Sequence, residues 1–170
     1  EPVVDDAIRA QLDDGITFTL MHPLEVEVAE RIVALVPGVE QVRFTKSGSD
    51  AVSAAVRAAR AHTGRDLVVV AGYHGWHDWY IGSTTRDRGV PKAVADLTLT
   101  APYGDLDPLG DLFRRHPGEI AAVVIEPSGA TVPPPGYLEG LVAMCREHGA
   151  LSVFDEVITG FRLAPGGARE

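Results

Sequence analysis

The strongest constraint on the fold is a series of short apolar segments without a polar face, which alternate with longer amphipathic segments. Residues 66–72 (DLVVVAG) and 119–127 (EIAAVVIEP) are short and rich in β-branched residues, a pattern that favours strands. Strands that are apolar on both faces occur in parallel sheets covered by helices on each side. The sequence therefore predicts an α/β fold with three layers, in which a mostly parallel sheet lies between two layers of helices.

Other segments repeat the same two patterns along the chain. The predicted strands are residues 39–45, 66–72, 95–103, 119–127 and 150–157. The predicted helices are residues 2–14, 23–36, 49–64, 107–116 and 137–149. Pro2 and Pro23 stand where a first helical turn tolerates proline, and Gly64 stands where the third helix should end. Because no repeat, low-complexity tract or linker interrupts the alternation, one layered unit is the simplest organisation.

Composition and charge argue against several classes of function. The net charge is −9 and the basic residues are scattered, which disfavours nucleic acid as a partner, although backbone amides can bind a small phosphate. No 18-residue window is apolar enough to predict a membrane span. Cys145 is the single cysteine and no secretory signal is evident, so we expect no disulfide framework and a cytoplasmic protein.

Polar residues that directly follow the predicted strands mark the expected functional site. Ligands of open parallel sheets bind beyond the carboxyl ends of the strands, so chemistry is expected there. Four strand ends carry such residues: TKSGSDA at 45–51, GYHGWHD at 72–78, EP at 126–127 and DEV at 155–157.

Ser47, Gly48 and Ser49 are candidates for a phosphate site at the start of the helix 49–64. Glycine lets the backbone approach a ligand closely, and the free amides and dipole of a helix start suit a phosphate. Alternatively, Ser49 caps the helix with Asp50 in the first turn, which stabilises the helix without binding a ligand. Asp50 would also repel a phosphate to some extent.

Tyr73 and His74 lie in an expected tight turn at a strand end and are candidates for stacking on, and hydrogen bonding to, a planar ligand. A metal site formed by His74, His77 and Asp78 is an alternative. The three-residue spacing of the two histidines suits a helix, whereas Gly75 favours a loop, so no metal is expected here.

Two tryptophans, Trp76 and Trp79, lie in or next to the same segment. Their expected role is to pack the loop onto the core, because large aromatic side chains are buried on average. Contact with a bound ligand is the alternative.

Asp155 directly follows the apolar residues 151–154, where its charge is costly unless a cation or several hydrogen bonds meet it. A protonated ring nitrogen of a bound heterocycle would serve, and would let the ring act as an electron sink. Val157, two residues further in the expected strand, would point to the same side and pack on the ring. Glu126 is a second carboxylate at this rim. Alternatively, both carboxylates form structural ion pairs with arginines or helix amides.

In their order and separations, the motifs SGSDA, YHG, IEP and DEVITGFR resemble those of the class-III aminotransferases, which are pyridoxal-phosphate enzymes of fold type I. The most similar branch is that of glutamate-1-semialdehyde aminomutase and its bacterial relatives. The resemblance covers essentially all 170 residues, including HPLEVEVAE. It implies that residues 1–170 are part of the large, cofactor-binding domain, and that the small domain is absent.

For the phosphate end of pyridoxal phosphate, the resemblance implies binding by Ser47, Gly48 and Ser49. Ser49 stands where a threonine is usual. Lys46 and Asp50 replace an asparagine and a glutamate that are common in the family motif, which leaves the chemistry of the neighbouring loop open.

For the ring of the cofactor, the resemblance implies that Tyr73 stacks on one face with His74 beside it. Asp155 is implied to bind the pyridine nitrogen and to support catalysis, and Val157 to cover the opposite face. Glu126 is implied to belong to the cofactor pocket.

The implied activity is transfer of an amino group between amine and carbonyl carbons, with a small-molecule amino donor and carbonyl acceptor and a homodimeric complete enzyme. The lysine that binds the cofactor aldehyde is expected beyond Glu170, so the activity is expected of the complete parent enzyme. The alternative is a catalytically inactive module for binding pyridoxal phosphate or for assembly. Arg86, Arg88 and Lys92 could reach a substrate carboxylate or a neighbouring subunit, or simply form an exposed polar loop.

Overall fold

The computed structural model describes residues 1–129 and 131–169, with only the backbone of residue 169. The chain forms two compact units, Glu1–Phe44 and Thr45–Glu170. All the residues proposed above for a functional site belong to the second unit.

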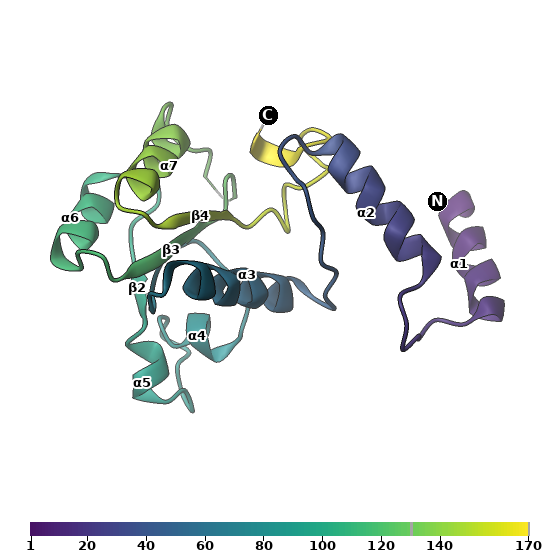
Figure 1. Cartoon of the computed structure of the whole chain (residues 1–170), viewed down its shortest axis with the longest axis horizontal. Coiled ribbons are helices and arrows are strands. Elements are labelled where there is room, and N and C mark those ends of the chain that lie inside the picture. Colours follow the sequence, from purple (N-terminus) through teal and green to yellow (C-terminus); the bar gives the residue numbers. More distant parts are fainter. Residues whose placement is uncertain (130, 170) are drawn as a thin grey trace. The chain divides into compact units, whose positions relative to one another are not determined.

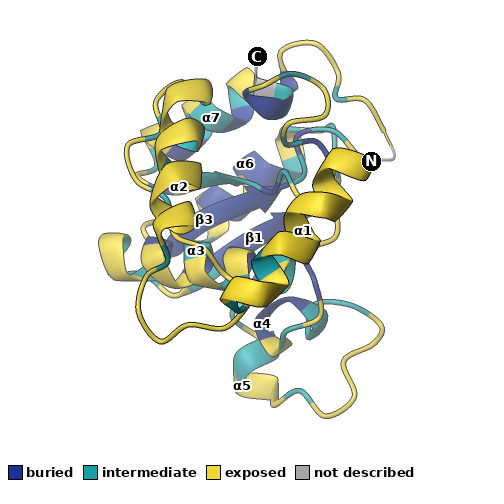
Figure 2. Cartoon of the chain, turned by 90° about the vertical axis from the view of Figure 1, so that its right-hand side faces the viewer, coloured by how far each residue is buried: buried dark blue, intermediate teal, exposed yellow. Residues whose placement is uncertain are grey.

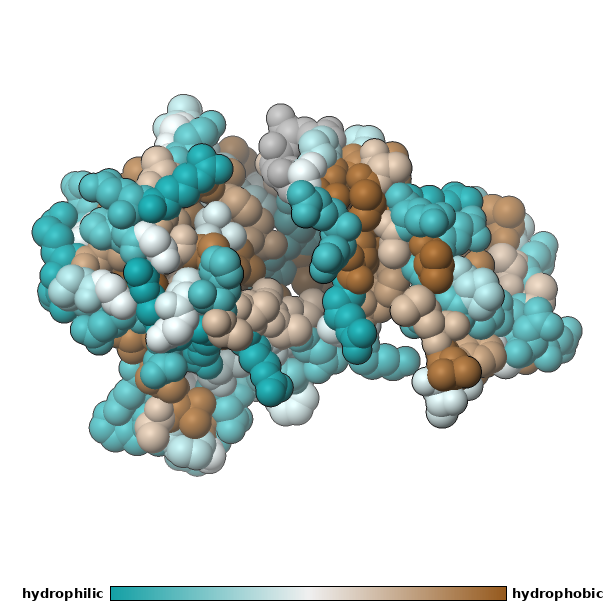
Figure 3. Space-filling view, in the orientation of Figure 1, coloured by the Kyte–Doolittle hydropathy of each residue, from teal (hydrophilic) through white to brown (hydrophobic). Residues whose placement is uncertain are grey.

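The first unit contains the two predicted helices, α1 (Pro2–Asp14) and α2 (Pro23–Leu35), each with proline in its first turn. His22 caps α2, because its Nδ1 atom accepts a hydrogen bond from the backbone N–H of Leu24 at 3.2 Å. Both helices lie wholly within the described residues, and neither contains a buried residue. They appear mostly in the colour of exposed residues in Figure 2, and apolar side chains are visible on the surface of this unit in Figure 3.

The second unit is built around a sheet that has four strands within the described residues (Figure 1). They are β1 (Leu67–Ala71), β2 (Thr98–Thr100), β3 (Ile120–Ile125) and β4 (Leu151–Phe154). The strand order is β2-β1-β3-β4 and all neighbours are parallel. Every residue of β3 is buried, as expected for a central strand covered on both faces.

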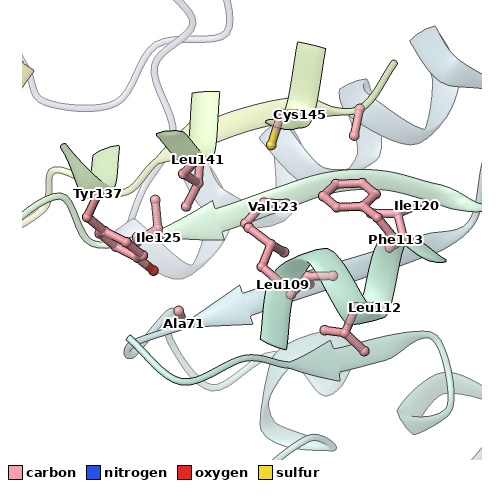
Figure 4. Close-up of a cluster of buried hydrophobic side chains, with 12 residues drawn as sticks. Ala71, Leu109, Leu112, Phe113, Ile120, Val123, Ile125, Tyr137, Leu141 and Cys145 are labelled. Atoms are coloured by element: carbon pink, nitrogen blue, oxygen red, sulfur yellow. The ribbon is translucent and has the colours of Figure 1, made fainter. Parts of the chain in front are cut away.

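Helices cover both faces of the sheet, which confirms the predicted three-layer α/β fold. The helices of this unit are α3 (Gly48–Thr63), α4 (Asp78–Ile81), α5 (Lys92–Ala95), α6 (Asp107–Arg115) and α7 (Tyr137–Glu147). Val68 and Val70 of β1 belong to the core formed with α3 and α4. Val69 and Ala71 belong to the opposite core, formed with α6 and α7 (Figure 4). This alternation follows the two-residue period of a strand.

A bulge in β3 shifts its register against β1. Leu67 pairs with Ile120, but the next residue, Val68, pairs with Ala122, which leaves Ala121 as an extra residue. Ile120 and Val123 therefore contribute to the same core although they are three positions apart.

Some predicted boundaries were wrong. Residues 39–45 do not form a strand, and no strand of the described residues pairs with them; an extended segment needs a partner for its backbone N–H and C=O groups to become part of a sheet. The strand predicted at 150–157 ends at Phe154, and that predicted at 95–103 shrinks to three residues. The four-residue helices α4 and α5 were not predicted, because one turn is too short to show a helical period.

Among the described residues, no helix has the length and apolar character needed to cross a membrane. The longest helix, α3, has 16 residues and is rich in alanine, with arginines on its surface.

Candidate functional site

A cavity of about 390 Å³ lies beyond the carboxyl ends of β1, β3 and β4, beside the start of α3. This is the edge at which parallel sheets bind ligands. The structure brings together all eight residues proposed from the sequence, which line this cavity: Ser47, Gly48, Ser49, Tyr73, His74, Glu126, Asp155 and Val157.

At the start of α3, Ser47 is the capping residue. Its Oγ atom accepts a hydrogen bond from the backbone N–H of Asp50 at 3.2 Å, and its hydroxyl donates to the Asp50 carboxylate at 2.8 Å. The alternative in which Ser49 caps this helix was therefore wrong by two residues. The amides of the first helical turn have no acceptor within the helix and suit an anion.

Two glycines allow neighbouring segments to approach this helix start. A Cβ atom added to Gly48 would lie 2.8 Å from Cγ2 of Val157, in the loop after β4. A Cβ atom added to Gly75 would lie 2.2 Å from the Ser49 hydroxyl, and Gly75 also has a φ of +93°, which side chains disfavour. Any other residue at either position would push the walls of the cavity apart.

Tyr73 and His74 follow β1 and point in different directions. The Tyr73 side chain is 63% exposed and lines the cavity, whereas His74 is only 1% exposed. His74 Nε2 lies 3.2 Å from the carbonyl oxygen of Ala71, which can only accept a hydrogen bond. Nδ1 lies 2.9 Å from Oδ2 of Asp155. Both ring nitrogens are thus engaged by the protein.

Asp155 is 8% exposed, and hydrogen bonds meet both of its carboxylate oxygens. Oδ2 pairs with His74, and Oδ1 accepts a hydrogen bond from the backbone N–H of Val157 at 3.2 Å. The Asp155 backbone N–H donates to Ile125 at 2.8 Å and fixes the residue at the sheet edge. Asp155 thus has a partner within the chain, His74, where the sequence analysis considered a ligand's ring nitrogen, an arginine or a helix amide.

Val157 does not continue the strand as the sequence suggested. The hydrogen bond from its N–H to Oδ1 of Asp155 turns the chain immediately after β4, which aspartate side chains commonly do. This turn brings Val157 against Gly48 at the cavity wall.

Glu126 follows β3 and its carboxylate points towards the turn after β1. Oε2 accepts a hydrogen bond from the backbone N–H of Tyr73 at 2.9 Å. The partner of this carboxylate is thus a backbone amide of the turn, in place of the arginine or helix amide of the ion-pair alternative.

Three further residues line the cavity that sequence reasoning did not assign to it: Gly75, Trp76 and Ile158. Trp76 is 68% exposed, so its expected role in packing the loop onto the core was wrong, whereas Trp79 is buried as expected. The sequence signal for Trp76 is its place in the polar turn GYHGWHD, directly after Gly75. No feature of the sequence distinguishes Ile158.

The two histidines proposed for a metal site have separate partners. His77 Nδ1 lies 2.8 Å from the Ser53 hydroxyl, whereas His74 pairs with Asp155. Arg86 and Arg88 in the loop that follows α4 are exposed, as is Lys92 at the start of α5, which pairs with Asp96 four residues later.

Comparison with known sequences gives one consistent result. The family described as Aminotransferase class-III matches residues 1–167. Glutamate-1-semialdehyde 2,1-aminomutases of Chloroflexus aggregans and Roseiflexus castenholzii are 44% and 45% identical to this chain over 183 aligned residues. In each case the match covers 99% of this chain but 42% of the relative, so the chain spans about two fifths of the length of these proteins.

Solved structures of similar fold agree. An omega-transaminase from Sphaerobacter thermophilus has a TM-score of 0.87 and 35% identity, over 98% of this chain and 43% of its own. A transaminase with PLP bound has a TM-score of 0.90 and 34% identity, over 99% of this chain and 43% of its own. The arrangement of helices and strands in this chain is thus that of one segment of each of these proteins, which makes up about two fifths of its length.

Proposed function

Because this chain belongs to the class-III aminotransferase family, we propose that it supplies the pyridoxal-phosphate site of an enzyme that moves an amino group between an amine and a carbonyl carbon. The observation that carries the proposal is the single cavity lined by all eight residues of the family-like motifs. All the residues that line the cavity belong to the second unit.

The phosphate is proposed to bind at the start of α3. The backbone amides of the first turn and the hydroxyl of Ser49 supply hydrogen-bond donors there. Ser47 contributes mainly as the helix cap, because Asp50 engages its hydroxyl. Gly48 lets Val157 lie directly against the start of the helix at this end of the cavity.

The ring is proposed to lie between Tyr73 and Val157. Tyr73 offers an exposed aromatic face, and Val157 offers an apolar surface from the loop after β4. Asp155 lines the same cavity and contacts His74 and the Val157 N–H, and each of its carboxylate oxygens can accept a further hydrogen bond from a protonated ring nitrogen.

The His74–Asp155 contact has a clear purpose in this proposal. His74 and the N–H of Val157 hold the two carboxylate oxygens in place and oppose rotation of the side chain. When bound, pyridoxal phosphate supplies the aldehyde that takes up the amino group and a ring that draws electrons from the reacting carbon. A fixed negative charge at the ring nitrogen favours the protonated ring, which is the better electron acceptor.

The substrates are proposed to be a small-molecule amino donor and a carbonyl acceptor, with the complete enzyme acting as a homodimer. The similarity to aminomutases favours a reaction in which donor and acceptor carbons belong to one molecule. The similarity to transaminase structures favours two separate molecules, and the residues named here serve both reactions equally.

The test is a visible absorbance titration of the purified chain with pyridoxal phosphate. We expect saturable binding, weakened about ten- to a hundredfold by Asp155→Ala, because hydrogen bonds to charged groups are worth about 1.5–3 kcal/mol. Asp87→Ala, which removes an exposed carboxylate outside the cavity, is the matched control and should bind like the unaltered chain.

Two results would contradict the proposal. One is the lack of saturable binding by the unaltered chain. The other is equal binding by Asp155→Ala and Asp87→Ala, which would show that the cavity does not recognise the ring nitrogen.

A further inference from the structure

The peptide group between Gly72 and Tyr73 is held by side chains on both sides. Its carbonyl oxygen accepts a hydrogen bond from the Tyr80 hydroxyl at 2.9 Å. Its N–H donates to Oε2 of Glu126 at 2.9 Å. Because a peptide group is planar, two hydrogen bonds to its two polar atoms fix the orientation of the whole plane.

The backbone at this point lies directly against the Glu126 carboxylate. A Cβ atom added to Gly72 would lie 2.6 Å from Oε2, and the φ of Gly72 is +108°, a value that side chains disfavour. The contact between carboxylate and amide therefore depends on a glycine at position 72.

Tyr80 provides a rigid support on the other side of the peptide. It is buried in the core with α3, and its ring packs edge-on against Tyr73, with ring centroids 5.7 Å apart. It also packs edge-on against His74 at 5.4 Å. Burial raises the pKa of the Tyr80 phenol, so the hydroxyl remains a donor at neutral pH.

The Tyr73 side chain, in contrast, is mostly exposed. Its ring packs edge-on against Tyr80, and the backbone sets the direction of the Cα–Cβ bond from which the ring extends and the rotamers open to it. The peptide plane that Glu126 and Tyr80 hold is the one that leads into Tyr73.

We propose that Glu126 and Tyr80 are positioning residues for Tyr73: by holding the Gly72–Tyr73 peptide from both sides, they set the ring against which a planar phosphorylated heterocycle binds. Glu126 thus acts through Tyr73 and does not itself bind the ligand. This inference rests on the proposed function, with pyridoxal phosphate as the heterocycle.

The first test needs no ligand and measures hydrogen exchange of the Tyr73 amide by NMR. In the unaltered chain the amide should exchange slowly, and Glu126→Ala should accelerate its exchange at least tenfold. Glu126→Gln should largely restore protection, because its carbonyl oxygen accepts the same hydrogen bond. Unchanged exchange in Glu126→Ala would overturn the proposal.

The second test measures the affinity for pyridoxal phosphate. Glu126→Ala should weaken binding about tenfold, because a hydrogen bond to a charged group is lost, and Tyr80→Phe about threefold, since its hydrogen bond is neutral. Glu126→Gln should lose less affinity for pyridoxal phosphate than Glu126→Ala. Tyr80→Phe keeps the buried ring, so it remains informative if the Glu126 variants fold poorly.

The decisive comparison repeats both substitutions in a Tyr73→Ala chain. If the two residues act through Tyr73, neither substitution should weaken binding further there. A persistent loss in that background would show direct contact with the ligand and overturn the proposal. If the unaltered chain binds no pyridoxal phosphate, the proposed function fails, and with it the role in ligand placement. The exchange measurement still decides whether the peptide is held.

Discussion

At the scale of single residues, the site depends on buried polar atoms whose hydrogen bonds are satisfied by neighbours far away in the sequence. His74 and Asp155 are 81 positions apart and meet at 2.9 Å, and both side chains are almost fully buried. A buried carboxylate that loses its partner is strongly destabilising, whereas an apolar pair of similar size is not.

This contact makes a stability prediction. His74→Leu leaves Asp155 buried without its partner and should lower the free energy of unfolding by about 3 kcal/mol. Urea denaturation followed by circular dichroism measures the change. In an Asp155→Asn chain, His74→Leu should lower the free energy of unfolding clearly less, because no buried charge is left without a partner. An equal cost in both chains would show that the loss comes from packing alone.

The burial of Cys145 predicts that the free energy of unfolding depends on pH in the alkaline range. Burial raises the pKa of its thiol from 9.0 to about 12. Between these values the unfolded chain releases a proton that the folded chain keeps, so the free energy of unfolding should fall as pH rises from about 9 towards 12 and be unaffected below that range.

Two measurements check this behaviour. Iodoacetamide at pH 9.5 should leave the folded chain unmodified and alkylate it fully in urea, as followed by intact mass. The decline in stability above pH 9 should be smaller in Cys145→Ala, in which other titrating groups are unchanged. Rapid alkylation of the folded chain would contradict the assigned burial.

At the scale of elements, the start of α3 combines a structural and a functional task. Ser47 caps the helix, and Gly48 and Ser49 in its first turn line the cavity. The helix buries Val52, Val56 and Ala59 against the sheet, so fraying at its first turn would alter the cavity before it altered the core.

Removal of the cap should therefore lower the free energy of unfolding by a modest amount. Ser47→Ala should lower the free energy of unfolding by about 1 kcal/mol, the usual value of a helix cap. Ser47→Asn can still cap the helix, so it should lower the free energy of unfolding by only a few tenths of a kcal/mol. If both variants were equally destabilised, the hydrogen bond from the Asp50 amide would not be responsible. Thermal unfolding of the three chains decides between these outcomes.

At the scale of the whole molecule, the chain contains one unit with two apolar cores and one without buried helix residues. Both cores, the sheet and the cavity belong to Thr45–Glu170. The apolar residues of α1 and α2, such as Val3, Ile8 and Leu12, are exposed.

We therefore expect residues 45–170 to fold without the first 44 residues. The shortened chain should keep a cooperative thermal transition and bind pyridoxal phosphate within about threefold of the full chain, because every residue that lines the cavity is retained. Circular dichroism and the absorbance titration check both points. A shortened chain without cooperative unfolding would show that the first unit contributes to the stability of the second.

The sequence was sufficient to predict the fold class and the edge of the sheet where the cavity lies. A wholly apolar strand such as Ile120–Ile125 suits a parallel sheet covered on both faces, and polar residues that follow such strands gather at one edge of the sheet. Eight of the residues that line the cavity were thus named from local patterns and from the family-like motifs, whereas Gly75, Trp76 and Ile158 were not.

What the sequence did not reveal are the partners of each polar atom. The pairing of Asp155 with His74, the contact of Glu126 with the Tyr73 amide and the failure of residues 39–45 to join the sheet all depend on segments brought together by folding. Local patterns indicate whether a residue is buried or exposed and which backbone conformation it favours. The direction of a hydrogen bond between distant segments depends on angstrom-scale packing, which only the tertiary structure determines.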